Sequence, residues 1–142
     1  MTLDEIIYNA LISDTNFYAA VDGRIRSTCF EVSPDEKDNT PLPSVIITDL
    51  GMQTQPECKD TDWEGSEEHV QAGVEISAES PRAVRELTLM ARHAVANYIF
   101  EMEWADRPIL DSVQTAGVAW DWLKPCYFDT IRYQCTTVNT LV

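Results

Sequence analysis

Apolar positions along this chain recur with two different periods, and the helical period is the first to appear. Over residues 3–11 the apolar side chains return every three or four positions, which predicts an amphipathic helix. A longer stripe of the same period covers residues 81–103 and follows Ser80 and Pro81, a typical N-cap and first helical residue. Since proline cannot continue a helix, we expect the long helix to end before Pro108.

Strand patterns occupy much of the remaining sequence. Residues 70–78 alternate strictly between apolar and polar side chains, as expected for a strand with one buried and one solvated face. The short apolar run at 44–50 predicts an interior strand buried on both faces. Further extended runs are predicted at 24–32, 109–120 and 126–138, and the last two should form a long antiparallel hairpin.

The order of these elements predicts the fold class. A helix, three strands, a long helix and two strands favour an α+β fold, with one mixed or mainly antiparallel sheet of about five strands and two helices packed on one face. Polar segments at 33–43 and 51–65 are expected to be loops, and the apolar cluster at 17–21 is assigned to no element. A length of 142 residues suits a single domain over residues 1–142.

Charge limits the classes of partner. The chain has 24 Asp and Glu against 10 Lys and Arg, a net charge of -14. Because nucleic-acid affinity depends on cations that replace condensed counterions, we expect no specific nucleic-acid binding. No apolar stretch is long enough to span a bilayer, and the first residues lack the pattern of a signal peptide, so we expect a cytoplasmic protein without a membrane partner.

Metal-binding and cofactor-binding patterns are weak. The 4 Cys include no Cys-x-x-Cys pair and the 2 His are far apart, which argues against zinc and favours buried, inert cysteines. The acidic loop resembles the start of a calcium-binding EF-hand loop, but Gln71 stands where a bidentate carboxylate is required. We therefore expect no cofactor and a solvated acidic loop that is a candidate contact for another subunit. Its candidate contact residues are Glu57, Asp60, Asp62 and Glu64.

The sequence shows no pattern that indicates catalysis. His69 is expected at a solvated strand end and His93 on the surface of the long helix, and neither position indicates an activated nucleophile. The carboxylate pair Glu101 and Glu103 should be exposed, whereas acid–base work requires burial that separates the two pKa values. We expect that the chain is not an enzyme.

Aromatic and cationic residues carry the more informative signals. Trp104, Trp120 and Trp122 are predicted to gather, with neighbouring aromatic residues, at the end of the long helix and around the last turn. They either cap the core or anchor a protein interface, where Trp supplies much of the binding energy. Three of the 10 cations share the long helix, either as a solvated face or as partners for a neighbouring subunit's acidic loop. These cations are Arg82, Arg85 and Arg92.

Four segments agree in order and local sequence with one protein family. They are residues 10–25, which include Gly-Arg-Ile at 23–25, then 42–47, 74–78 and 80–100. Together they resemble the tail terminator, or tail completion, proteins of long-tailed bacteriophages. The shared features are an opening helix with a short polar break, a proline-led apolar strand, an alternating strand and a long Ala-rich helix. The loops at 33–40 and 53–68 depart from the family's pattern.

The resemblance implies a structural role in the virion, with assembly in the bacterial host cytoplasm. Copies of such a phage or prophage protein would close into a homo-oligomeric ring, a hexamer, that caps the tail tube and contacts head-connector proteins. Ring closure uses a heterologous, head-to-tail interface. The alternative is a cytosolic protein-binding adaptor domain unrelated to phage, which would remain a monomer.

Overall fold

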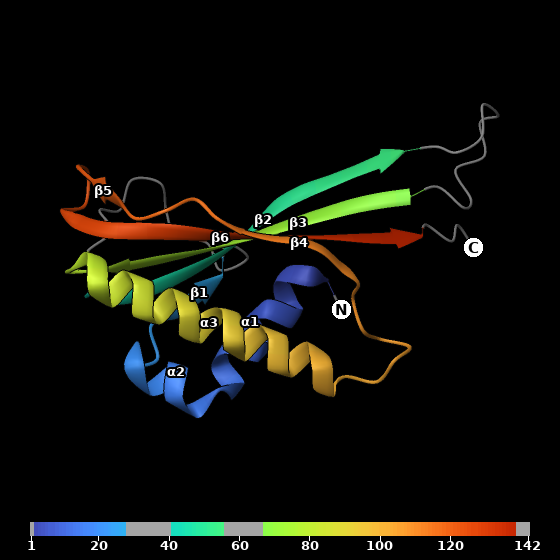
Figure 1. Ribbon diagram of the computed structural model, residues 1–142, viewed down its shortest axis with the longest axis horizontal. Helices are drawn as coiled ribbons and strands as arrows, with labels where there is room; N and C mark the ends of the chain where they lie inside the picture. Colours follow the sequence, from blue (N-terminus) through green and yellow to red (C-terminus); the bar gives the residue numbers. More distant parts are fainter. Residues whose placement is uncertain (1, 28–40, 56–66, 139–142) are drawn as a thin grey trace.

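The chain folds into one sheet with helices on one side of it. The computed structural model describes residues 2–27, 41–55 and 67–138 (Figure 1). Within these ranges the elements, in chain order, are α1 (Leu3–Ser13), α2 (Thr15–Ala20), β1 (Ile25–Ser27), β2 (Ser44–Gln55), β3 (Glu67–Ala78), α3 (Pro81–Glu101), β4 (Leu110–Thr115), β5 (Ala119–Asp121) and β6 (Cys126–Val138). This is the α+β class that the sequence predicts.

The sheet is mixed, and β3 lies at its centre. The strand order is β1-β2-β3-β6-β4, and β5 pairs with β6 next to β4. β1 is parallel to β2, while the other pairings are antiparallel. The predicted hairpin of the last two extended runs is thus confirmed, since both β4 and β5 pair with β6.

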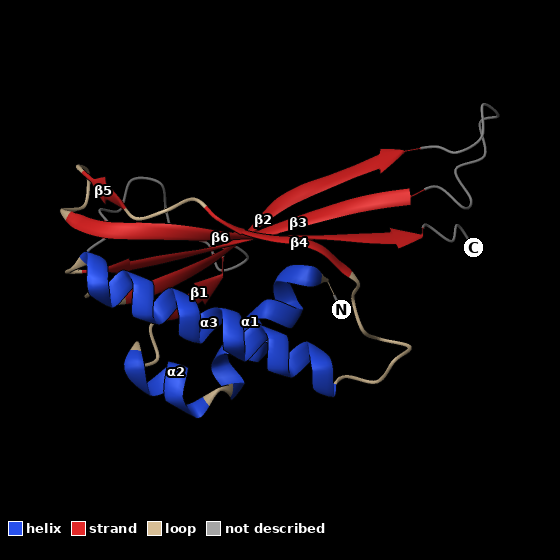
Figure 2. Ribbon diagram, viewed as in Figure 1, coloured by secondary structure: helices blue, strands red, loops and turns tan. Residues whose placement is uncertain are grey.

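The core lies between the sheet and the helices, all three of which lie on one side of it (Figure 2). Ala72, Val74 and Ile76, the alternating apolar positions of β3, are buried together with the apolar stripes of α1 and α3. Burying one aliphatic side chain of this size contributes about 1.5 to 3 kcal/mol, so the strict alternation also sets the register of β3.

Within the described ranges the helices number three, where two were expected. The additional helix is α2, which covers the unassigned apolar cluster. The Oδ1 atom of Asp14 accepts a hydrogen bond from the backbone N–H of Phe17 at 2.9 Å, and Phe17 is fully buried. One N-cap and one anchoring aromatic residue thus form a helix of 6 residues that is too short to show a helical period.

β2 differs from its prediction in length and in burial. It extends to Gln55, into the segment 51–65 that was predicted to be a loop. Val45 and Ile47 are fully buried, but Leu50 is 40% exposed, so the expected burial on both faces is wrong. The helices cover one face of the sheet, which leaves alternate positions of β2 without a second layer.

The sheet has six strands instead of about five because the run 109–120 is interrupted. Gly117 adopts a φ of 97, a conformation that favours glycine, between β4 and β5. Its N–H donates to Oδ1 of Asp129 at 3.0 Å, which holds the interruption against β6. This local break divides one predicted strand into two.

Arg24, within the Gly-Arg-Ile sequence, joins the start of β1 to the start of β2. Its Nε donates to the carbonyl oxygen of Pro43 at 2.8 Å, and another guanidinium nitrogen donates to the carbonyl oxygen of Leu42 at 3.1 Å. A third nitrogen contacts the Asp22 carboxylate at 3.1 Å. The arginine therefore holds the chain before β2 in place for the parallel pairing with β1.

We predict that Arg24→Ala lowers the free energy of unfolding by about 2 to 3 kcal/mol, because two charge-assisted hydrogen bonds to carbonyl oxygens are lost. Urea denaturation followed by circular dichroism measures the change. The matched control is Arg82→Ala, which removes an exposed ion pair and should change stability by less than about 0.5 kcal/mol. Equal losses in the two variants would contradict this role of Arg24.

Candidate functional site

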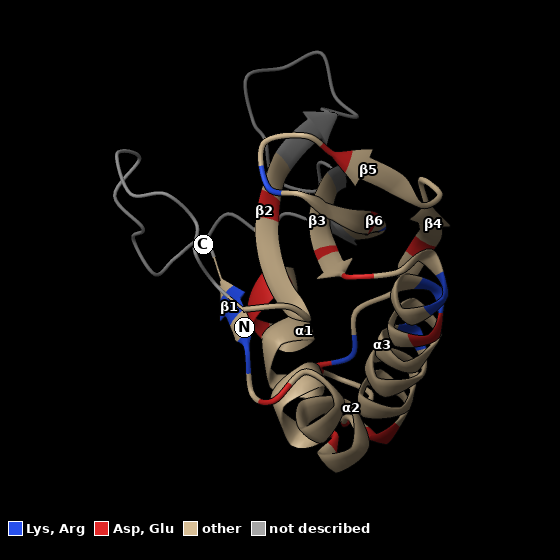
Figure 3. Ribbon diagram, turned by 90° about the vertical axis from the view of Figure 1, so that its left-hand side faces the viewer, with Lys and Arg blue, Asp and Glu red and all other residues tan. Residues whose placement is uncertain are grey.

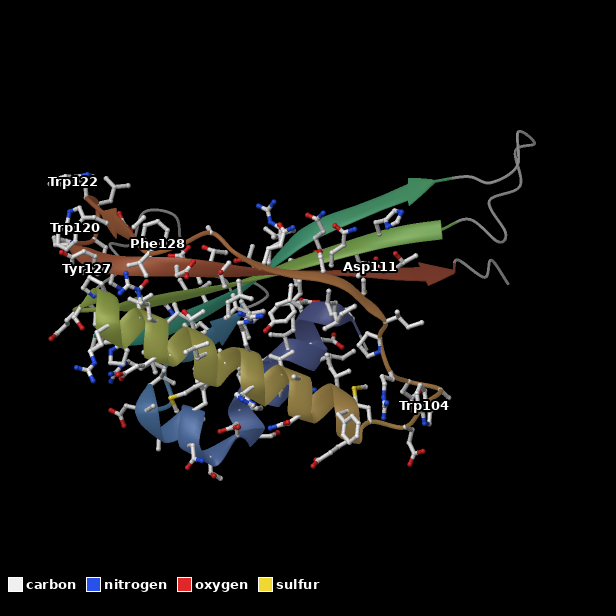
Figure 4. The ribbon with its side chains drawn as sticks, in the orientation of Figure 1. Trp104, Asp111, Trp120, Trp122, Tyr127 and Phe128 are labelled. Carbon is white, nitrogen blue, oxygen red and sulfur yellow. The ribbon has the colours of Figure 1, made fainter. Side chains whose placement is uncertain are left out.

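The predicted tryptophan group divides into two clusters. Trp120 and Trp122 lie with Tyr127 and Phe128 at one end of the molecule, whereas Trp104 lies at the opposite end (Figure 4). The expectation of a single gathering of Trp104 with Trp120 and Trp122 is therefore wrong. α3 runs along the sheet, so its C-terminal end is far from the turn between β5 and β6.

The hairpin cluster consists of Trp120, Trp122, Leu123 and Tyr127. The ring of Trp120 meets Tyr127 edge-on at a centroid distance of 4.8 Å and Trp122 edge-on at 6.0 Å. Tyr127 packs against the core, so these contacts connect the exposed tip to the body of the protein. Trp122 is 86% exposed and Leu123 is 98% exposed.

A tight turn fixes the backbone of this tip. The Oδ1 atom of Asp121 accepts hydrogen bonds from the N–H groups of Leu123 at 2.9 Å and Lys124 at 3.4 Å. An aspartate that bonds to the backbone two residues later is typical of such turns. The tip therefore presents two large apolar side chains in a defined arrangement.

The helix-end cluster consists of Phe100, Trp104 and Arg107. The guanidinium of Arg107 lies 4.3 Å from the Trp104 ring centroid and 5.6 Å from that of Phe100. It also donates to the carbonyl oxygens of Phe100 and Met102 at the end of α3. Trp104 is 83% exposed, and Phe100 and Ile109 are exposed as well.

These exposures decide between the two interpretations of the tryptophans only in part. Trp104 and Trp122 do not cap the core, because most of each side chain faces solvent. Trp120, at 38%, is less exposed and supports the tip. Exposed aromatic clusters of this kind are typical of interaction sites.

The three arginines of α3 are all exposed. Blue segments mark the Lys and Arg positions along α3 in Figure 3. Arg82 donates through Nε to the Glu86 carboxylate at 3.0 Å, one helical turn away. Arg85 and Arg92 are on the same helix, and Arg92 borders the space between α3 and β4. Their predicted acidic counterparts, Glu57, Asp60, Asp62 and Glu64, lie outside the described residues.

Among the described residues, neither histidine lies beside a buried carboxylate in the contacts that the structure shows. His93 is exposed, as expected. His69 is half-buried, with Nδ1 at 3.1 Å from Oγ1 of Thr136, and that hydroxyl donates to the carboxylate of Asp111. Asp111 is exposed, so the relay lacks the buried carboxylate that an activated base requires. Glu101 and Glu103 are also exposed.

Two cysteines are placed by the structure, and both are buried. Burial raises the pKa of the Cys126 thiol, and burial likewise raises the pKa of Cys135. Both therefore behave as the small buried hydrophobes that the sequence predicts, since the thiolate is the reactive form. Cys29 and Cys58 lie outside the described ranges.

Comparisons with known proteins add a distant likeness of fold. No protein-family model matches the sequence, and no curated protein matches it. Among solved structures, 22 chains match. One belongs to a structure described as "Virion of native gene transfer agent (GTA) particle", with 15% identity, 95% coverage of both chains and a TM-score of 0.44. A likeness this distant carries no argument for a function.

Across residues 2–27, 41–55 and 67–138, no group of three His, Cys, Asp or Glu side chains is placed to hold a metal ion. In the same part of the chain, no helix is long and apolar enough to cross a membrane.

Sequence reasoning missed Arg107, Leu123 and Tyr133. Arg107 immediately precedes Pro108, and Leu123 lies between the two predicted runs of the last hairpin. The aromatic residues around Arg107 and the turn-forming Asp121 before Leu123 were available signals. Nothing in the sequence singles out Tyr133, because the feature that matters, a buried hydroxyl without a hydrogen-bond partner among the described residues, depends on the fold.

We predict that Arg107→Ala lowers the free energy of unfolding by about 1 to 3 kcal/mol, because α3 loses two charge-assisted carbonyl contacts and the cation–π contact with Trp104. Urea denaturation is the measurement. Arg85→Ala, on the exposed face of the same helix, should stay within about 0.5 kcal/mol of the wild type. An unchanged midpoint for Arg107→Ala would show that the guanidinium does not stabilise the end of α3.

Proposed function

We propose that this chain is a structural protein of a phage or prophage virion, a tail terminator whose copies close into a ring on the tail tube and join it to the head connector. The order and local sequence of the four segments that resemble that family support the proposal. In it, the protein has no catalytic role and no cofactor, and it belongs to the virion after assembly in the host cytoplasm.

The observation that carries the proposal is the pair of exposed aromatic clusters at opposite ends of the molecule. Trp122 and Leu123 stand out at one end, and Trp104 stands out at the other. A head-to-tail ring needs two different surfaces on each subunit, whereas a two-fold dimer needs one self-complementary surface. Separate exposed clusters at the two ends of one chain therefore favour contacts with more than one neighbouring molecule.

Charge supports the same role. The net charge of -14 makes DNA adsorption unfavourable, so a ring with an acidic lumen would let DNA pass without binding it. Against this background Arg85 and Arg92 are exposed cations on α3, suited to pair with the acidic surface of a neighbouring copy.

A cytosolic adaptor domain is the second candidate function, because exposed tryptophans also suit the capture of an unrelated partner. Self-association separates the two candidates. A terminator brings copies of itself together, whereas an adaptor remains a monomer at every concentration.

We predict that the double charge reversal Arg85→Glu with Arg92→Glu weakens self-association by at least tenfold, because it replaces attraction to a neighbour's carboxylates with repulsion. Sedimentation velocity over a range of protein concentrations measures the association, and circular dichroism checks that the fold is retained.

The matched control is Arg132→Glu compared with the single variant Arg92→Glu. Each changes the net charge equally, but Arg132 is exposed on β6, away from α3. Association should fall for Arg92→Glu and stay near the wild-type value for Arg132→Glu. If the double variant assembles as the wild type does, α3 is not part of the interface.

A further inference from the structure

A groove between α3 and β4 has apolar walls and a basic rim, and one residue that lines it is a tyrosine with a buried hydroxyl. Its volume is about 360 Å³, which accommodates a large side chain. Leu89 and Ala96 line it from α3, and Val113 lines it from β4. Arg92 and His93, both exposed, border it on the helix side.

Tyr133, from β6, is among the residues that line this groove. It is 2% exposed, and within the described part of the chain its hydroxyl has no hydrogen-bond partner. Burial raises the pKa of Tyr133 well above its usual value, while the positive charge of Arg92 acts in the opposite direction. A buried hydroxyl without a partner is unfavourable, so a donor that reached it would form a strong contact.

The hairpin cluster contains a side chain that fits this description. Trp122 has an apolar indole with one N–H donor, and it is held by the Trp120 ring and by the turn at Asp121. Rigid presentation lowers the entropy lost on binding. Trp104 is a poorer candidate, because its ring is already in contact with the Arg107 guanidinium.

We propose that the α3–β4 groove of one copy receives Trp122 and Leu123 of a second copy, with the indole N–H donating to the hydroxyl oxygen of Tyr133. The inference rests on the proposed function, which requires that copies assemble head to tail. The groove is the receiving surface and the hairpin tip is the inserted surface of that interface.

The distance between tip and groove within one chain, and the charges beside them, both favour a hairpin tip that comes from a second copy. On β6, Tyr127 and Tyr133 are separated by about 20 Å of extended strand, so the tip cannot fold back into its own groove. Asp121, next to Trp122, would approach Arg92 and His93 at the rim. Because the hydroxyl is covered in the separate chain, the proposed contact requires a side chain at the rim to move aside. Arg92, which is exposed, would then pair with that carboxylate.

The first test is a double-mutant cycle with Trp122→Phe and Tyr133→Phe, measured by sedimentation equilibrium. Each variant removes one partner of the proposed hydrogen bond and should weaken association about threefold to tenfold. The double variant should be no weaker than either single one, because both lose the same bond. Independent, multiplicative effects, or no effect in either variant, would overturn the pairing.

The stability of the separate chain distinguishes a role of the Tyr133 hydroxyl in association from a role in folding. Tyr133→Phe removes a hydroxyl without a partner in the separate chain, so its urea midpoint at low protein concentration should be unchanged or higher. A fall in the midpoint together with weaker association would assign the effect to folding and overturn the proposed role of the hydroxyl.

The second test fills the groove. Ala96→Trp places a large ring among the lining residues and should weaken association at least tenfold. Asn97→Trp, at the next exposed position and outside the lining, should leave association unchanged. If the wild type forms an oligomer and the Ala96→Trp variant forms it equally well, the groove inference is wrong, but the proposed self-assembly still stands. If the wild-type chain stays monomeric, both the groove inference and the proposed self-assembly are wrong.

Discussion

The packing of β3 against the helices is the interaction on which the rest of the structure depends. β3 pairs with β2 on one side and with β6 on the other over its full length. Its apolar face contacts the same core as α1 and α3. A slip of one residue in β3 would bring Gln71 and Glu75 into that core, which fixes the position of every neighbouring strand.

This one-sided packing explains why large side chains remain outside the core. The helices lie on one side of the sheet, and α3 covers it along its middle (Figure 2). The tip between β5 and β6 and the segment after α3 extend beyond that cover. Trp122 and Trp104 therefore lie at the two ends, where another molecule can reach them. The surfaces proposed for assembly thus follow from the way in which the core is closed.

The fold was largely predictable from the sequence, because period and capping residues act locally. The alternation of 70–78 and the Ser80–Pro81 start of α3 predicted their elements correctly. The helix α2 was missed, since it depends on the tertiary burial of Phe17. The break between β4 and β5 depends on a contact between Gly117 and Asp129. In the candidate site, the exposure of the three arginines could be foreseen from their place on the helix. The separation of the tryptophans could not, because it depends on how α3 lies along the sheet. The unpartnered hydroxyl of Tyr133 likewise depends on three-dimensional packing.

Native mass by light scattering over a wide range of protein concentrations tests the central claim, that this chain assembles with copies of itself, most directly. The account predicts a closed oligomer of fixed size, near six times the chain mass of 16.1 kDa, that dissociates only on dilution. A mass of 16.1 kDa at every concentration would contradict it and favour the adaptor domain.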